Sequence, residues 1–220
     1  MIIKKKPRTV IPPLEADTYS GTLIGVVDLG EQEFMKKFRR EVLLIFEIAG
    51  EYVDVEQDGK TEKMPRWLSR RFTASIDPKS NLYACLSGWK GSAIEDEEFD
   101  LSTLLGAPAL LNVTVQTSKD GNPYNLIQGI MKPMRGMDIP APESEILDFD
   151  MERPETWDVL DKLPEWMKEA VERSSTWAAL QKNTGETITP EAFKGGGELP
   201  FDTKDEKPQE TAKTTRKRAF

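Results

Sequence analysis

The chain has 220 residues, of which 38% are hydrophobic and 31% charged, and its formal net charge is −8. This composition suits one globular domain with poorly ordered extensions. The chain contains no histidine and one cysteine, Cys85, which excludes histidine-based nucleophile pairs, an intrachain disulfide and a cysteine-based zinc site. The acidic run 95–100 lacks a recognisable metal-ligand spacing, and no glycine-rich phosphate motif occurs. We therefore expect a non-enzymatic protein with no cofactor, metal or catalytic residue.

The charges are unevenly distributed along the chain. Residues 1–90 carry 15 basic and 13 acidic side chains, whereas residues 141–180 carry 4 basic and 11 acidic ones. A basic first part followed by an acidic region is typical of a protein with a polyanion site, because the local field steers the ligand. The N-terminus lacks the apolar stretch of a signal peptide, and no run approaches the length of a membrane span. We expect a cytoplasmic protein.

The first half of the chain predicts three strands after a flexible arm. Residues 1–18 contain three prolines and no periodic apolar pattern, which is typical of an arm. A β-branched stretch with two glycines predicts a curved strand over 19–27, and a charged loop is expected over 31–40. The short apolar run 42–48 predicts a central strand, and the alternating stretch 70–76 predicts a third.

The next part predicts a helix and then a hairpin. Asp77 followed by proline is a typical helix start, and Gly88 is placed to end that helix. A second short helix is expected from Asp100, before strands over 109–116 and 124–131. Mainly β structure with short helices, in five strands with a helix between the third and fourth, is the order of an OB-fold-like barrel.

The remaining chain divides at composition changes. We expect the OB-like, nucleic-acid-binding domain over residues 19–136, an acidic helical extension over 137–180, and a disordered tail over 181–220. A helix starting at Pro164 would carry an apolar stripe, expected to dock on the barrel, formed by Leu163, Met167 and Val171.

Cations repeatedly stand beside aromatic rings in two clusters, residues 34–40 and 64–91. Cations follow phosphates while rings stack on unpaired bases, so this pairing is typical of single-strand binding. The competing interpretation is that the rings are core residues and the cations cover them with their stems. This ambiguity applies most to Phe72 and Trp89, whereas Arg66 and Trp67 lie in a less regular segment and are expected to be exposed. The candidate nucleic-acid-binding residues are Lys36, Lys37, Phe38, Arg39, Arg40, Arg66, Trp67, Arg70, Arg71, Phe72, Trp89 and Lys90.

Several segments together resemble a family of bacteriophage replication-region proteins. The matching stretches are Ser75–Leu82, Leu86–Gly91, Phe99–Leu101 and Leu104–Gly106, supported by Tyr19, Tyr124 and Ile127. The resemblance spans roughly residues 15–135. It implies an OB-fold-like single-stranded DNA-binding protein of a phage replication or recombination module.

The tail carries a second motif, at Leu199, Pro200 and Phe201. It is similar to the acidic, Pro-Phe-ended tip with which bacterial single-stranded DNA-binding proteins recruit replication and recombination partners. Here the motif is internal, and the chain ends on a basic segment instead. A linker with chance residues is the competing interpretation. The alternative function is an adaptor or inhibitor that binds another protein through its acidic C-terminal region.

Overall fold

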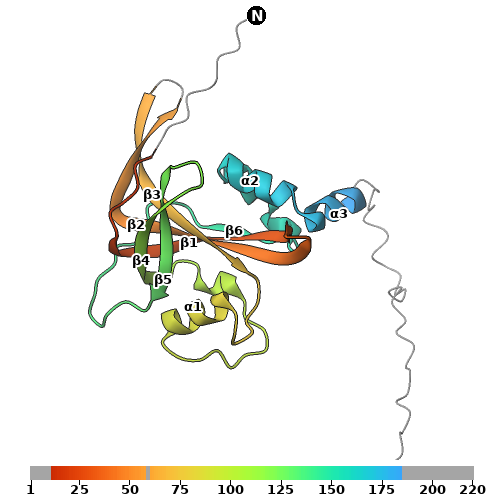
Figure 1. The fold of residues 1–220 in the computed structure, drawn as a ribbon, viewed down its shortest axis with the longest axis horizontal. Coiled ribbons are helices and arrows are strands. Elements are labelled where there is room, and N and C mark those ends of the chain that lie inside the picture. The colour runs from red at the N-terminus through yellow and green to blue at the C-terminus, as the bar shows by residue number, and fades with distance from the viewer. Residues whose placement is uncertain (1–10, 58–59, 185–220) are drawn as a thin grey trace, which may run out of the picture. The chain divides into compact units, whose positions relative to one another are not determined.

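Within residues 11–57 and 60–184, which the computed structural model describes, the chain is mainly β (Figure 1). A curled antiparallel half-barrel of five strands carries short helices, which confirms the expected structural class at that level. The strands are β1 (Asp17–Phe34), β2 (Lys37–Gln57), β3 (Lys60–Thr73), β4 (Pro108–Thr117), β5 (Pro123–Met131) and β6 (Leu147–Phe149). The helical elements are α1 (Asn81–Lys90), η1 (Leu101–Leu104), η2 (Pro154–Lys162), α2 (Glu165–Glu172) and α3 (Ser175–Thr184).

The five long strands form one path with the order β3-β2-β1-β4-β5, in which all neighbours are antiparallel. β4 pairs with the first part of β1, up to Thr22. Beyond a register shift between Leu23 and Gly25, the short strand β6 pairs with β1 in parallel. The expected order of three strands, a helix and a hairpin is therefore confirmed, and α1 lies between β3 and β4 in the chain.

The two edges of this path, β3 and β5, approach each other through arginine side chains. Arg70 Nη1 donates to the Gln128 carbonyl oxygen at 2.7 Å, and Arg66 Nη2 donates to Asn125 Oδ1 at 3.2 Å. Asn125 also bonds both the amide and the carbonyl of Leu14. Side chains therefore bridge this seam, and they fasten the end of the expected N-terminal arm to it.

β1 and β2 bury side chains on both faces. On the inner face, Leu44 and Phe46 pack with α1 in one core, whereas on the outer face Leu43 and Ile45 pack with the C-terminal segment in another. Figure 1 shows α1 and α2 on opposite sides of β1. A strand covered on both faces requires a run such as 42–48, which is apolar except for Glu47.

The charged loop expected over 31–40 is wrong, because these residues form the end of a hairpin. β1 continues to Phe34 and β2 begins at Lys37, so Met35 and Lys36 alone make the turn. The third strand is also longer than expected and ends at Thr73. Cross-strand pairing explains both extensions, since exposed polar segments carry little local strand signal.

The boundaries of α1 also differ from the expectation. Ser80 is its N-cap and accepts from the Tyr83 amide, while Asp77 accepts from the Lys79 amide in the preceding turn. The helix runs through the expected stop and ends at Gly91, whose φ of 76° suits glycine. Serine and aspartate are both good caps, and the observed cap lies three residues after the expected one.

The C-terminal segment docks on the strands as the apolar stripe predicts. Leu163, Met167 and Val171 are all buried in the outer core. β6, η2 and α3 were not expected. α3 extends to Thr184, beyond the expected start of the tail, and the remainder of the tail and residues 1–10 lie outside the described residues.

Shortening Met167 tests this docking. We expect Met167→Ala to lower the free energy of unfolding by about 2–4 kcal/mol, because it leaves a cavity under α2. The matched control is Glu169→Ala on the exposed face of the same helix, with an expected change within about 0.5 kcal/mol. Urea titration measures both. Equal small effects would contradict a packed outer core.

The only cysteine gives a pH test of the inner core. Burial raises the pKa of the Cys85 thiol to about 11. Both states hold the proton below about pH 9, whereas between about pH 9 and 11 only the unfolded chain ionises. The free energy of unfolding should therefore fall by up to about 2–3 kcal/mol across this range. Cys85→Ala should lack this component, so parallel pH profiles for the two proteins would contradict it.

Candidate nucleic-acid interface

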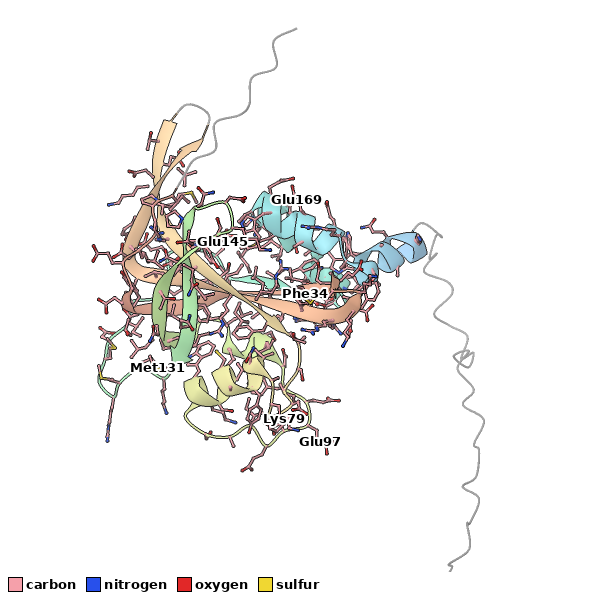
Figure 2. All side chains as sticks on the ribbon, in the orientation of Figure 1. Phe34, Lys79, Glu97, Met131, Glu145 and Glu169 are labelled. Atoms are coloured by element: carbon pink, nitrogen blue, oxygen red, sulfur yellow. The ribbon has the colours of Figure 1, made fainter. Side chains whose placement is uncertain are left out.

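The β1–β2 hairpin brings together aromatic and cationic side chains at an exposed tip. Phe34 pairs with Lys37 across the two strands, and Phe38 pairs with Glu33. Phe34 is 52% exposed, Met35 82% and Phe38 60%, so these apolar groups face solvent. Figure 2 shows Phe34 at this end of the hairpin. We name residues 34–39 the hairpin tip.

Alternation along the strands places the tip residues on two faces. Phe34, Lys37 and Arg39 share one face, and the Arg39 guanidinium lies 5.6 Å from the centroid of the Phe34 ring. Phe38 lies on the opposite face with Glu33. Each face of the tip therefore exposes one phenyl ring, and one of them has cations beside it.

The turn itself is conformationally costly. Met35 has φ 51° and Lys36 φ 62°, the left-handed region that a two-residue hairpin of this kind needs at both positions. Asn-Gly or Asp-Gly ordinarily fills such a turn, because other residues pay about 1–2 kcal/mol each in this region. The sequence instead places a thioether and an ammonium group there. Strained residues of this type cluster at functional sites.

The tip cations differ from their neighbour Arg40 in their partners. Among the described residues, no ion pair involves Lys36, Lys37 or Arg39. Arg40, by contrast, bonds Asp28 at 2.8 Å and Glu152 at 2.6 Å. Its hydrogen bond with Asp28 raises its pKa further above the ordinary arginine value. Arg40 therefore joins β2 to the C-terminal segment, which does not fit its expected role in phosphate binding.

Two expected stacking residues are core residues instead. Trp89 is 6% exposed, donates its indole N–H to the Pro108 carbonyl at 2.8 Å, and packs against Phe46. Phe72 is also buried, with the Arg70 guanidinium over its ring at 4.7 Å. Neither ring offers a free face to a base, so we remove both from the candidate site. The ambiguity noted for these two residues resolves toward packing.

The pair expected to be most exposed, Arg66 and Trp67, is largely covered. Arg66 is 8% exposed and donates to the Pro12 carbonyl as well as to Asn125. Burial lowers its pKa. Trp67 is half-buried on the outer face, where its indole N–H donates to Ser144 Oγ at 2.8 Å. The expectation of exposure for Arg66 is wrong, because β3 turns this side chain into the seam.

Arg70 and Arg71 point to different sides of β3. Arg70 spans the seam to β5, whereas Arg71 is exposed and makes one contact of 3.3 Å with Glu41. Lys90, at the end of α1, is exposed and distant in sequence from the tip. Of the expected residues, the structure thus gathers Lys36, Lys37, Phe38 and Arg39, and it adds Phe34 and Met35. Their signal was present in the cation–aromatic cluster 34–40.

Three further features concern a metal site, a membrane-spanning helix and the tail motif. Among residues 11–57 and 60–184, no group of acidic or cysteine side chains is arranged to hold a metal ion. No helix in this part of the chain is long and apolar enough to cross a membrane. Leu199, Pro200 and Phe201 lie outside the described residues.

Comparison of the sequence with protein-family models and with curated proteins returns no match. The candidate interface therefore depends on the geometry of this chain alone.

Replacing both turn residues tests whether Met35 and Lys36 lower the free energy of unfolding. We expect Met35→Asn with Lys36→Gly to raise the free energy of unfolding by about 1 kcal/mol, because both residues tolerate positive φ. Urea titration measures the difference. A loss of stability would contradict this explanation and would mean that the exposed Met35 and Lys36 side chains contribute to folding.

Proposed function

We propose that this chain is a non-enzymatic single-stranded DNA-binding protein of a phage replication or recombination module. The hairpin tip carries the proposal, because it offers rings for stacking and unpaired cations for phosphates in an otherwise acidic protein. Base stacking contributes about 1–3 kcal/mol per base and tolerates any sequence. The strained turn keeps Met35 and Lys36 at the point where single-stranded DNA would make contact.

The strand order supports an OB-fold-like identity for the half-barrel. β1 pairs with both β2 and β4, β3 and β5 meet at the seam, and α1 lies between β3 and β4. An OB-fold has this neighbour relation and commonly binds single strands. Fold alone does not decide function, and the tip is the feature that supports binding.

The covered outer face limits where a DNA strand could bind. β6, η2, α2 and α3 cover much of β1 and β2 on that face, including Leu43 and Ile45. This face of the half-barrel is therefore occupied by the protein itself. In our proposal the DNA strand is held at the hairpin tip and at the nearby end of β3.

The alternative, an adaptor that binds protein through the acidic segment, receives less support. An adaptor helix ordinarily presents an apolar stripe to its partner. Here Leu163, Met167 and Val171 are buried against the strands, so this stripe already has an intramolecular partner. The acidic groups around it remain on the surface.

The decisive experiment is a titration of fluorescent oligo-dT and of its duplex across several salt concentrations. Tight single-strand binding, weak duplex binding and a steep salt slope are expected, with no cleavage when magnesium is added. Phe34→Ala with Phe38→Ala should raise Kd at least about tenfold, because two stacking surfaces are lost.

Trp166→Ala is the matched control, since Trp166 is an exposed aromatic on α2 that lines a pocket with Val55 and Met64, at the opposite end of β2 from the tip. It should leave Kd unchanged. Failure of the wild-type protein to bind oligo-dT at low salt would overturn the proposed function. Equal effects of the control and the tip variant would remove the tip from the site.

A further inference from the structure

A pocket lies where β3 ends and the chain turns into α1. Its volume is about 520 Å³, and its lining includes Arg70, Arg71, Thr73, Ser75 and Lys79. Figure 2 shows Lys79 in the segment that connects β3 to α1. We name this cavity the β3–α1 pocket. Its size is within the range of small-molecule sites, and its lining is cationic and hydroxyl-bearing, which suits phosphate oxygens.

The three cations of the pocket are held in different ways. Arg70 is fixed by its bond to the Gln128 carbonyl and by the Phe72 ring beneath it. Arg71 makes a single long contact with Glu41, which orients the guanidinium while leaving its other N–H groups for a ligand. Lys79 makes no ion pair among the described residues. The pocket therefore holds one structural cation and two that are available.

Two carboxylates also line the pocket, and both have donors. Glu41 accepts from Arg71, and Asp77 Oδ1 accepts from the Lys79 amide at 2.8 Å. Three cations against two carboxylates leave the lining with an excess of one positive charge. An anion that enters would compete with Glu41 for Arg71 and would pair with Lys79 without displacing another carboxylate.

The pocket is connected to the hairpin tip by a row of side chains on one face of β2. Lys37, Arg39 and Glu41 alternate along this face with the same phase as Leu43, which is directly opposite Arg71 on β3. Lys37 and Leu43 are six positions apart along β2, a span of about 20 Å. β3 ends opposite Glu41, so β2 continues from the pocket to the tip without β3 beside it.

We propose that the β3–α1 pocket is a second phosphate-binding point for the single strand held at the hairpin tip. The DNA strand follows Lys37 and Arg39 along β2, then meets Arg71 on β3, and places a phosphate in the pocket. This inference rests on the proposed function. A span of about 20 Å corresponds to roughly six stacked nucleotides, so only longer oligonucleotides reach both points.

The experiment measures the binding of dT4 and of dT12 to the full wild-type chain and to the double variant Arg71→Gln with Lys79→Gln. Arg70 is left intact because it bridges β3 and β5. We expect affinity for dT12 to fall roughly tenfold and the salt slope to decrease by about 0.7–1.4, the equivalent of one or two phosphates. Binding of dT4 should change little, because it is held at the tip.

Two controls separate the pocket from general charge. Lys132→Gln with Arg135→Gln removes the same charge beyond β5, where Lys132 lies beside Gly91 at the opposite end of α1, and should have little effect. Arg71→Lys with Lys79→Arg keeps both cations and should retain most of the salt slope. Thermal unfolding of each variant verifies that the fold is intact.

The outcomes distinguish the two proposals. If the wild-type protein binds neither oligonucleotide, the proposed function itself fails. If it binds both and the pocket variant matches the charge control in affinity and salt slope, the pocket inference is overturned while the proposed function stands. An equal loss for dT4 and dT12 would also overturn the inference, because it would indicate one compact site.

Discussion

The need to cover both faces of β1 and β2 governs this structure. Their central residues are apolar on both sides, and exposing either face would leave Leu43 and Ile45, or Leu44 and Phe46, in water. The half-barrel interior with α1 covers one face, and the C-terminal segment covers the other. The acidic extension is therefore part of the folded unit. Glu47 reinforces the cover, since its buried carboxylate accepts the amides of Glu143 and Ser144 at 2.8 and 2.9 Å.

This cover determines where binding chemistry remains available. With the outer face occupied, side chains are free where β1 and β2 extend past their partners, as they do at the hairpin tip and at the end of β3. Adjacent arginines illustrate the boundary. Arg40 bonds Asp28 and the C-terminal segment's Glu152, whereas Arg39, on the opposite face, lies over Phe34. The alternation of a strand thus assigns one arginine to structure and leaves the next for a ligand.

Local patterns predicted the elements well where the signal was periodic or where a cap was clear. The apolar run 42–48, the alternation in β4 and the cap at Asp100 all correspond to observed features. The hairpin tip escaped prediction as a strand because charged residues interrupt its apolar pattern and its two strands pair mainly with one another. Exposure was harder to predict. Arg66 and Trp89 have the same kind of neighbours in sequence as Phe38, but the seam and α1 bury them. Burial depends on which distant element covers a residue, and a single sequence does not contain that information locally.

The turn at Met35 and Lys36 is the place where local preference and the fold disagree. Folded proteins generally agree across these levels, and the exceptions concentrate at functional sites. A two-residue turn with both φ angles positive favours Asn and Gly, and nothing in the packing requires Met35, which is 82% exposed. A packing role does not explain the choice, whereas the ligand contact that we propose would explain it. The strain, the exposed rings and the unpaired cations are independent observations, and all three occur within the same six residues. Their coincidence is the strongest reason to place the binding site at the hairpin tip.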